Sequence, residues 1–294
     1  MLYGYRNNIS KEWQDRLNEH FETVYSPIVG KDAVPLVIHY QIEDWVGEEH
    51  FAEVSPYLFP EIKVLDVGSG FGGFVRALRK RNYEAFGVEL SDFDAEFARY
   101  RVVQEVPDCN SNEIYNIGSA LKLPFRSNSF DLVTFWHVIE HIDGIDKALS
   151  EACRVLKPGG RIVIVAPNYM AFRKEAHYHV QWAPYLPKGI ASIYLRLRGR
   201  DPSFLQNYIH YVSKGSIRKK LKAHGLEIEN ETRSKIENPD AIGRNSVRKV
   251  IKILKQIGLS WFLYLYCDLK LWNPMSSTIR FSALKGEKDS NDCQ

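Results

Sequence analysis

The sequence lacks the long apolar run of a membrane protein. No stretch of its 294 residues reaches the ~18 consecutive apolar residues that a membrane-spanning helix requires. The first residues, which include Arg6, Lys11 and Glu12, contain no apolar run either, so we expect no signal peptide. These absences predict a cytoplasmic protein.

Cysteine is scarce, and the net charge is small. The four cysteines include no Cys-x-x-Cys pair, which argues against a zinc knuckle and against a disulfide framework: Cys109, Cys153, Cys267 and Cys293. We expect all four to be reduced thiols. The net charge of +3 gives no general affinity for nucleic acid, so a nucleic-acid partner is not expected.

A glycine-rich turn stands between a strand and a helix. Residues 62–67 are mostly apolar and β-branched, which predicts a buried strand. Four of the next six residues are glycine, and Phe74, Val75 and Leu78 then recur at helical spacing. Glycine permits positive φ and leaves no side chain between the backbone and a ligand. This arrangement is typical of the nucleotide-cradling half of a doubly wound fold.

Two acidic residues bear on which nucleotide binds there. The glycines at 68, 70 and 73 satisfy the Gly-x-Gly-x-x-Gly pattern of dehydrogenases, which is a rival interpretation. Asp66 argues against it, because a carboxylate beside a pyrophosphate is unfavourable. The same carboxylate suits the sulfonium and ammonium groups of S-adenosylmethionine (SAM). Glu89 ends the next strand and can accept both ribose hydroxyls of either nucleotide.

The downstream segments favour SAM. Residues 123–125 form a Leu-Pro-Phe turn, residues 130–135 predict a fourth strand, and residues 156–160 form a turn into a fifth strand at 161–165. With Leu-Asp-Val-Gly-Ser-Gly at 65–70, this run resembles the class I SAM-dependent methyltransferases. The Ile-Glu-His segment at 139–141 is similar to the branch that acts on small molecules and lipid precursors. The resemblance is strong over residues 60–167 and weaker over 168–230.

The resemblance implies an α/β fold with a doubly wound, seven-stranded, mostly parallel sheet. Its strand order would be 3-2-1-4-5-7-6, with an antiparallel seventh strand. The implied cofactor is SAM, and the residues implied to bind it are Asp66, Gly68 and Gly70 for the methionine part, Glu89 for the ribose, Leu90 beside it, and Ser119 and Ala120 for the adenine. Ser119 departs from the family, which usually has an aspartate there to accept from the adenine amino group.

The end of the fourth strand carries the candidate catalytic residues. His137, Glu140 and His141 would share one face if the segment turned helical. His141 is the candidate general base for an O-methyl acceptor, with His137 second, because the histidine pKa of ~6.5 lies near working pH. Two alternatives stay open: these residues orient the loop by hydrogen bonds, or they belong to a metal site.

The metal alternative comes from a second resemblance. Small RNA 3′-end methyltransferases of the superfamily hold a metal with a Glu-x-x-Glu-His segment and a later histidine. Here His137 stands in place of the first glutamate, and His177 or His179 would supply the later ligand. The sequence shows no clear second basic domain that could bind RNA, which counts against this alternative. No metal is predicted.

Four further parts are expected around the core at 61–167. Residues 1–60 would form a helical cap, with a helix over about 11–25 that Ser26-Pro27 ends, and would cover the SAM pocket or pack on the sheet edge. Residues 168–211 would form an aromatic lid. Residues 212–285 would complete the core with a helix capped by Ser213 and strands at 226–231 and 278–284, and residues 286–294 would be a polar tail. Within the core, Ser91 is a candidate N-cap, with Asp94 as its capping-box acid.

The lid and the C-terminal part are basic. The lid has six basic residues against two acidic ones, and from Arg244 to Trp272 six basic residues face Asp268 alone. Residues 247–272 predict an amphipathic helix whose apolar stripe includes Val250, Ile257 and Trp261. It would lie on an anionic membrane, as a peripheral contact at the inner face, or pack on the lid.

The predicted function is SAM-dependent methyl transfer, as O-methylation of a small-molecule, glycan or lipid-linked acceptor. The basic segments favour an anionic or membrane-proximal acceptor, such as a lipid-linked or nucleotide-linked sugar or an isoprenoid quinone precursor. The alternatives are a metal-dependent RNA 3′-end methyltransferase and a non-catalytic SAM-binding module. The sequence predicts no oligomeric state.

Overall fold

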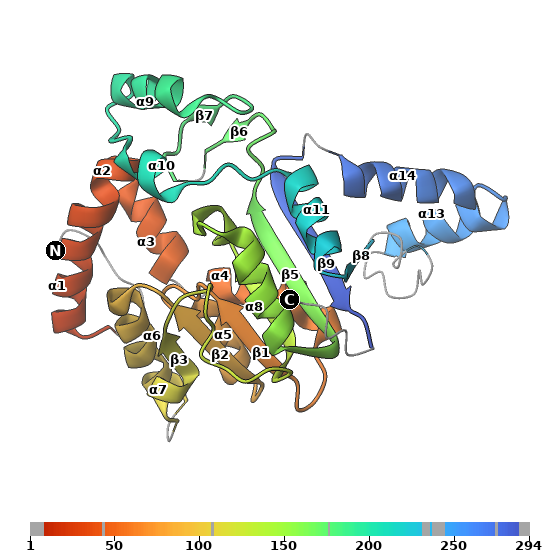
Figure 1. Ribbon diagram of the computed structural model, residues 1–294, viewed down its shortest axis with the longest axis horizontal. Helices are drawn as coiled ribbons and strands as arrows, with labels where there is room; N and C mark the ends of the chain where they lie inside the picture. The colour runs from red at the N-terminus through yellow and green to blue at the C-terminus, as the bar shows by residue number, and fades with distance from the viewer. Residues whose placement is uncertain are drawn as a thin grey trace.

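The computed structural model describes residues 9–42, 45–106, 109–175, 177–230, 236, 245–273 and 276–287. Its centre is a seven-stranded sheet in the order β3-β2-β1-β4-β5-β9-β8 (Figure 1). The strands are β1 Lys63–Val67, β2 Glu84–Glu89, β3 Tyr115–Ile117, β4 Phe130–Trp136, β5 Leu156–Pro167, β8 Leu226–Glu229 and β9 Thr278–Lys285. The first five pair in parallel, and β9 is antiparallel to both β5 and β8. This confirms the predicted fold class, strand order and antiparallel final strand.

Helices cover both faces of the sheet, because alternate residues of its strands are apolar on each face. Leu65 and Val67 of β1 pack in one core cluster with α8 (Ile145–Val155) and α11 (Lys214–Ala223). Val64, one residue before Leu65, packs in a second cluster with α4 (Trp45–Val54), α5 (Gly73–Arg79) and α6 (Asp92–Glu105). Such burial on both faces is usual for parallel strands. The short helix α7 (Ser111–Ile114) leads into β3.

The predicted turn at 156–160 lies inside a longer strand. Phe130 of β4 pairs with Leu156, whereas Leu132 pairs with Arg161, so residues 157–160 bulge out of the ladder. Gly159 has a φ of 71° within this bulge. The turn is therefore where the Pro-Gly-Gly signal put it, but the strand begins before it.

The N-terminal helices are more broken than predicted. They comprise α1 (Lys11–His20), a π-helical turn over Phe21–Tyr25, α2 (Ser26–Val29), α3 (Val34–Ile42), α4 and the 3₁₀ turn Ser55–Tyr57. The prediction that Ser26-Pro27 ends the first helix is wrong. Pro27 lies in the first turn of α2, where a missing N–H removes no helical hydrogen bond. The helical path instead ends at Gly30, which has a φ of 85°.

Two of the three predicted helix-cap features are confirmed. The Ser91 side chain accepts a hydrogen bond from Asp94 N, and Ser213 forms a capping box with Ser216. Asp94 is not the capping-box acid, because the backbone N–H of Ser91 donates to Glu89 instead. The acid at the end of β2 thus takes over a role that is usually filled inside the helix.

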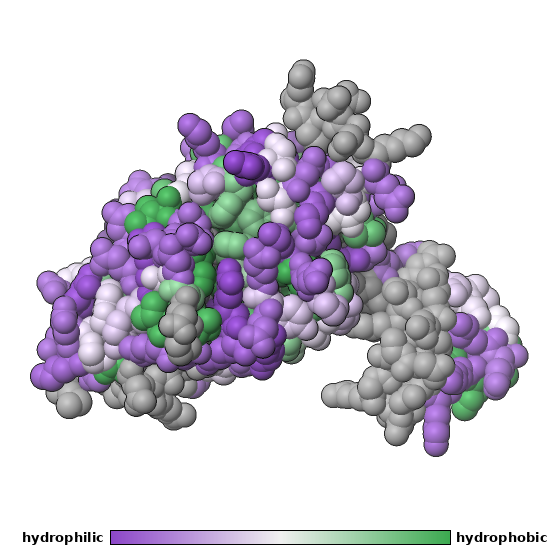
Figure 2. All heavy atoms as spheres, turned by 90° about the horizontal axis from the view of Figure 1, so that it is seen from below, coloured by the Kyte–Doolittle hydropathy of each residue, from purple (hydrophilic) through white to green (hydrophobic). Residues whose placement is uncertain are grey.

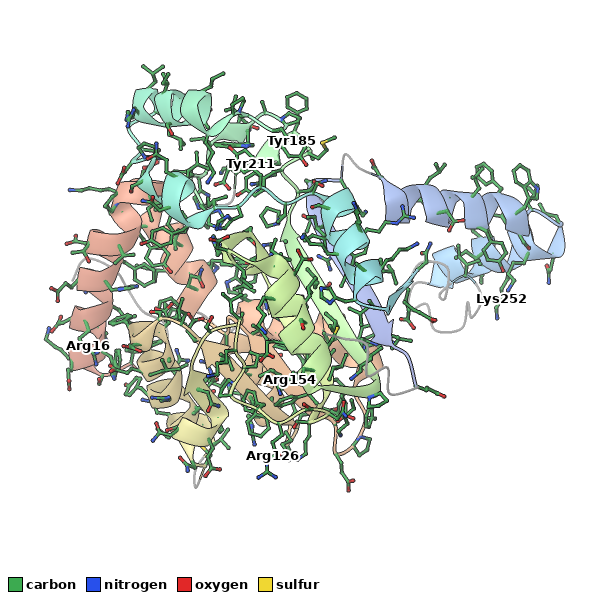
Figure 3. The ribbon with its side chains drawn as sticks, in the orientation of Figure 1. Arg16, Arg126, Arg154, Tyr185, Tyr211 and Lys252 are labelled. Carbon is green, nitrogen blue, oxygen red and sulfur yellow. The ribbon has the colours of Figure 1, made fainter. Side chains whose placement is uncertain are left out.

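The lid after β5 has a packed aromatic core. Its elements are β6 (Arg173–Lys174), β7 (Gln181–Trp182), α9 (Lys188–Leu197) and α10 (Ser203–Tyr208). Tyr169, Tyr178 and Trp182 are fully buried and join the same core cluster as β4 and β5. Tyr211 stacks on Tyr169 with ring centroids 4.6 Å apart, and it lies near Tyr185 (Figure 3). Phe172, in contrast, is exposed.

The basic C-terminal segment forms a hairpin of two helices, α13 (Asn245–Gln256) and α14 (Ser260–Trp272), which projects from the body (Figure 1). Its buried side chains are Ile251 and Leu263, which pack with Ile236. The apolar stripe predicted for one helix is divided between the two: Ile251 is buried, whereas Val250, Ile257 and Trp261 are exposed. In the described part of the chain, no helix is long and apolar enough to cross a membrane.

Several predicted features lie outside the described residues. These are most of the linker at 233–246, the end of the strand predicted at 226–231, and the tail from residue 288.

Candidate active site

The glycine turn after β1 lies at the carboxyl edge of the sheet. Gly68 and Gly70 have φ angles of 74° and 50°, which residues other than glycine rarely adopt. A Cβ added to Gly68 would lie 2.3 Å from Cγ2 of Val138, so only glycine lets the segment after β4 approach this closely. A Cβ added to Gly70 would meet no atom within 4 Å, so open space lies beside the turn there.

Glu89 links the end of β2 to this turn. Its Oε2 accepts the backbone N–H of Gly70 at 2.8 Å, and its Oε1 accepts those of Leu90 and Ser91 at 2.8 and 2.9 Å. A carboxylate has about four acceptor positions, so it can still accept from a ligand hydroxyl. The Leu90 side chain next to it is 73% exposed, which provides an apolar surface beside the carboxylate.

Ser119 and Ala120 follow β3 at the same edge. The Ser119 hydroxyl accepts the backbone N–H of Leu121 at 3.2 Å, and both residues are partly buried. Since β3 lies beside β2, the structure brings these two residues to the side of the sheet where Glu89 ends.

Asp66 makes its contact within the sheet. Its side chain is buried, and its Oδ1 accepts the Thr134 hydroxyl at 2.7 Å, which joins β1 to β4. Burial raises the pKa of this carboxyl well above its usual value, although the Thr134 hydrogen bond opposes the shift. A contact between Asp66 and the methionine part of SAM therefore stays a prediction.

The N-terminal helices contact the glycine turn. Phe71 is buried, and its ring lies 5.9 Å from that of Phe21. Burial raises the pKa of Tyr25, and the carboxylates of Asp94 and Glu89 add to the shift, so Tyr25 lies near both. These contacts favour the alternative in which the N-terminal helices cover the pocket, rather than the one in which they pack on the sheet edge. The covering role stays a prediction.

The segment after β4 does not form the helix that would align its polar residues. Only Ile139–His141 make a 3₁₀ turn, and His137 lies outside it with a φ of 54°. The conditional prediction of one shared face is therefore wrong for His137. A left-handed conformation at a non-glycine residue carries strain, which is common at functional sites. Burial lowers the pKa of His137 to about 4, so its imidazole is neutral at pH 7.

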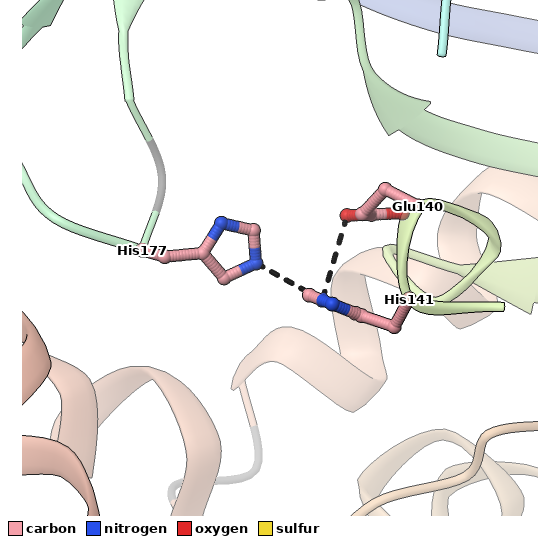
Figure 4. Close-up of side chains that lie close together, drawn as sticks. All are labelled: Glu140, His141 and His177. Atoms are coloured by element: carbon pink, nitrogen blue, oxygen red, sulfur yellow. Dashed lines mark hydrogen bonds and ion pairs between the residues drawn. The ribbon is translucent and has the colours of Figure 1, made fainter. Parts of the chain in front are cut away.

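His141 meets a histidine from the lid. Its Nε2 lies 3.0 Å from Nε2 of His177, and its Nδ1 lies 2.9 Å from the carbonyl oxygen of Tyr208 (Figure 4). Because a carbonyl only accepts, Nδ1 carries the proton and donates. The Nδ1 of His177 donates in turn to Glu175 at 3.0 Å, since that carboxylate is ionised. Of the two later histidines, the structure therefore brings His177 to His141.

Glu140, next to His141, is fully buried, and neither of its oxygens has a hydrogen-bond partner among the described residues. Its Oε1 lies 4.0 Å from Nε2 of His141. Burial raises the pKa of Glu140 to about 7, against the lowering effect of the charge on His177. Burying a carboxyl group in this way lowers the stability of the folded state unless the group has a hydrogen-bonding or charged partner.

A family model described as a methyltransferase domain matches residues 65–164, which run from within β1 to within β5 and include the glycine turn, Glu89 and His137 to His141. The chain is 33% identical over 123 residues to the ubiquinone/menaquinone biosynthesis C-methyltransferase UbiE of Laribacter hongkongensis, covering 40% of this chain and 48% of that protein. It is 32% identical over 135 residues to UbiE of Methylococcus capsulatus, covering 44% and 54%.

Residues 65–164 form a class I SAM-dependent methyltransferase domain. The chain spans about half the length of the curated relatives it matches. Two solved structures are similar in fold to this chain. YcgJ of Bacillus subtilis has a TM-score of 0.50 and 19% identity, covering 84% of this chain and all of that one. Phosphoethanolamine N-methyltransferase 2 of Haemonchus contortus has a TM-score of 0.52 and 19% identity, covering 91% and 60%.

The methyltransferase domain has residues that fit SAM. The open space beside Gly70, the carboxylate of Glu89 and the exposed Leu90 lie together at the carboxyl edge of the sheet, where the resemblance predicts this cofactor. When bound, SAM supplies an electrophilic methyl group on its sulfonium.

Glu175 is the site residue that the sequence analysis missed. It lies 35 residues beyond Glu140 along the chain, yet it orients the histidine that meets His141. The available signal was its isolation, since Glu175 and Asp201 are the two acids among six basic residues of the lid. An acid buried among cations commonly pairs with one of them.

Proposed function

We propose that this chain transfers the methyl group of SAM to a small-molecule acceptor. The observation that carries the proposal is that two groups of residues share one edge of the sheet. The glycine turn follows β1 and Glu89 ends β2, whereas His137 to His141 follow β4, which pairs with β1. Because parallel strands end at the same edge, a bound methyl group and an acceptor can be brought together there.

The reaction would be an in-line displacement. The acceptor atom bonds to the methyl carbon while the carbon–sulfur bond breaks, S-adenosylhomocysteine leaves, and the acceptor proton passes to a base or to water. Alignment of the two reactants supplies most of the acceleration in such a step. We propose His141, or secondarily His137, as the group that receives the proton. His141 would exchange its contact with His177 for one with the acceptor.

The proposed acceptor atom is an oxygen of a small-molecule, glycan or lipid-linked compound, with neutral imidazoles facing it. A carbon acceptor is the second candidate, because the curated relatives are named C-methyltransferases. Labelling with SAM that carries a ¹³C methyl group separates the two, since O-methyl and C-methyl carbons have distinct chemical shifts in the product.

Titration with SAM, and separately with NADH, tests the cofactor. We expect micromolar binding of SAM alone. NADH binding without SAM binding would return residues 68–73 to the dehydrogenase interpretation. Glu89→Ala should lower SAM affinity about 100-fold or more, because two hydrogen bonds to a charged group are lost. Glu84→Ala, at the opposite end of β2, is the matched control, and equal affinity in all three proteins would reject this assignment of the site.

We also propose that the α13–α14 hairpin lies on an anionic membrane surface. Lys249 and Lys252 are exposed on α13, and Trp261 and Phe262 are 62% and 55% exposed on α14 (Figure 3 labels Lys252). Hydrophobic and hydrophilic residues lie side by side at the far end of the hairpin (Figure 2). Basic residues beside interfacial aromatics favour anionic lipid. Flotation with vesicles that contain phosphatidylglycerol, at low salt, should recover the protein with the lipid; failure to float would remove this part of the proposal.

A further inference from the structure

We propose that Glu140, His141 and His177 bind a divalent metal cation of the kind that accepts imidazole nitrogen, such as Zn²⁺, Fe²⁺, Mn²⁺ or Co²⁺. Each residue offers one ligand atom: a carboxylate oxygen from Glu140 and Nε2 from each histidine (Figure 4). These three atoms all lie within 4.8 Å of one another. Two histidines and one carboxylate on a single ion are a common ligand set for these metals.

The spacing of the two histidines fits a shared ion. Their Nε2 atoms are 3.0 Å apart. With metal–nitrogen bonds of about 2.1 Å, two ligands on one ion lie about 3.0 to 3.4 Å apart, in octahedral and tetrahedral geometry respectively. The Glu140 oxygen lies 4.0 Å from Nε2 of His141 and within 4.8 Å of Nε2 of His177, so it would move closer to both nitrogens when the ion binds.

The hydrogen bonds at the other ring nitrogens present both Nε2 atoms for binding. Nδ1 of His141 donates to the Tyr208 carbonyl at 2.9 Å, and Nδ1 of His177 donates to Glu175 at 3.0 Å. When both rings are neutral, these tautomers leave a bare lone pair at each Nε2, so the proton that charges His177 would leave when the ion binds. Metal-binding histidines are usually oriented by hydrogen bonds of this kind, from Nδ1 to a carboxylate or a backbone carbonyl.

The residue that orients His177 is itself held rigidly. Glu175 is buried and also accepts hydrogen bonds from Arg173 at 2.9 Å, from the Tyr178 backbone at 2.7 Å and from the Tyr169 hydroxyl at 3.2 Å. This network fixes the lid histidine in place before any ion binds, which lowers the entropy lost on binding.

The surroundings of Glu140 indicate whether a metal ion or a single proton lies between the two histidines. Two bare lone pairs 3.0 Å apart need a positive charge between them, and a proton on His177 would satisfy that contact. It would leave both oxygens of the buried Glu140 without a partner. A divalent cation satisfies the two nitrogens and the carboxylate at once, so it accounts for all three side chains.

The role of the ion rests on the proposed function, with His141 as a ligand of the ion and with His137 or water as the group that receives the acceptor proton. The site follows β4, beside the glycine turn, so the ion would lie next to the acceptor. An open coordination position would hold an acceptor oxygen and lower the pKa of its hydroxyl, which makes the oxygen a better nucleophile. We therefore infer an acceptor with a metal-binding oxygen, such as an enol, a phenol or one hydroxyl of a vicinal diol.

Titration of the full chain, after chelator treatment and dialysis, with Zn²⁺ and with Co²⁺ tests the site. We expect one ion per chain by calorimetry and, for Co²⁺, visible d–d absorption bands. Glu140→Gln and His177→Ala should each weaken binding about 100-fold, the scale of loss seen on removing groups that support a metal. His179→Asn, two residues further along the lid and outside the ligand group, should bind the ion as the parent does.

SAM affinity of each variant serves as the folding control and keeps the two proposals separate. SAM binding with no stoichiometric metal binding by the parent chain would overturn the metal site and leave the proposed function standing. Metal binding without SAM binding would do the reverse. Equal metal affinity in the parent and in both ligand variants would also overturn the site, because any bound ion would then lie elsewhere.

Discussion

At the scale of single residues, one buried carboxylate determines where the lid meets the core. Burial by itself would raise the pKa of Glu175, but the charge and hydrogen bond of His177 outweigh it and hold this pKa well below its usual range. Arg173 lies beside the same carboxylate. Removing one partner of such a buried group strongly destabilises the folded protein, because it leaves an uncompensated charge. The lid is therefore attached through charge as well as through Tyr178 and Trp182.

Asp94 provides a prediction at the same scale. Burial, and then the charge of Glu89, raises the pKa of its carboxyl from 3.8 to about 7. Its neighbours include His20, at 3.8 Å, and Ser91, which donates its backbone N–H to Glu89. A raised acid pKa means that the folded state keeps its proton to higher pH than the unfolded state. The stability from this group is complete below pH ~4 and is lost as the pH rises through about 7.

Asp94→Asn removes this titration. We compare the unfolding free energy of the variant with that of the parent at each pH. This difference should be about 1 to 3 kcal/mol more in favour of the variant at pH 8 than at pH 4. Urea unfolding at the two pH values measures the difference. Asp92→Asn, which changes an exposed carboxylate in the same helical turn, is the control. A pH-independent difference between the Asp94 variant and the parent would contradict the prediction.

At the scale of elements, helix packing depends on a close approach that no local pattern reveals. Gly47 lies in α4, and a Cβ built there would be 2.3 Å from the carbonyl oxygen of Gly73, the first residue of α5. The absence of a side chain at Gly47 lets α4 reach the start of the helix that follows the glycine turn. His50, one turn further along α4, stacks on Trp136 with ring centroids 4.1 Å apart.

Gly47→Ala should therefore destabilise the protein by about 1 to 3 kcal/mol, the usual effect of forcing extra volume into a packed contact. Thermal or urea unfolding measures it. Gly189→Ala, in α9, is the matched control, because a Cβ there would meet no atom within 4 Å. That change should be neutral or stabilising by up to about 1 kcal/mol, since alanine is the better helix former. Similar effects of the two substitutions would refute the close-approach argument.

At the scale of the whole molecule, the hairpin and the sheet have separate cores. The hairpin buries Ile251 and Leu263 with Ile236, whereas the sheet clusters contain the strands and their covering helices. The two flanking strands, β8 and β9, pair directly with each other, so the sheet does not need the hairpin to close. The hairpin is accordingly an attachment to a complete fold.

Replacement of residues 231–275 by a short glycine-serine linker tests this division. We expect the variant to keep the SAM affinity of the parent, and its unfolding midpoint within about 5 °C, since none of the described residues that form the sheet clusters lies in this segment. It should lose binding to anionic vesicles. A large loss of SAM affinity would show that the hairpin completes the cofactor site, as the alternative of packing on the lid predicts.

The sequence by itself determined the strands of the sheet and the glycine turn. Strand patterns, the glycines at 68–73 and the acid that ends β2 depend on residues next to one another, and these local preferences agree with the final fold. The resemblance then supplied the strand order, which periodicity does not contain. Ser91 and Ser213 were also predictable as caps, because a cap needs a partner only three residues away.

Only the tertiary structure decided which distant side chains meet. His141 and His177 are 36 residues apart, and their contact depends on the path of the lid and on its anchor at Glu175. The same holds for the approach of Gly68 to Val138, and for the carboxylate of Glu140, which has no hydrogen-bond partner among the described residues. Such contacts arise where separate elements pack together, and no local spacing encodes the distance between elements that are far apart in the chain.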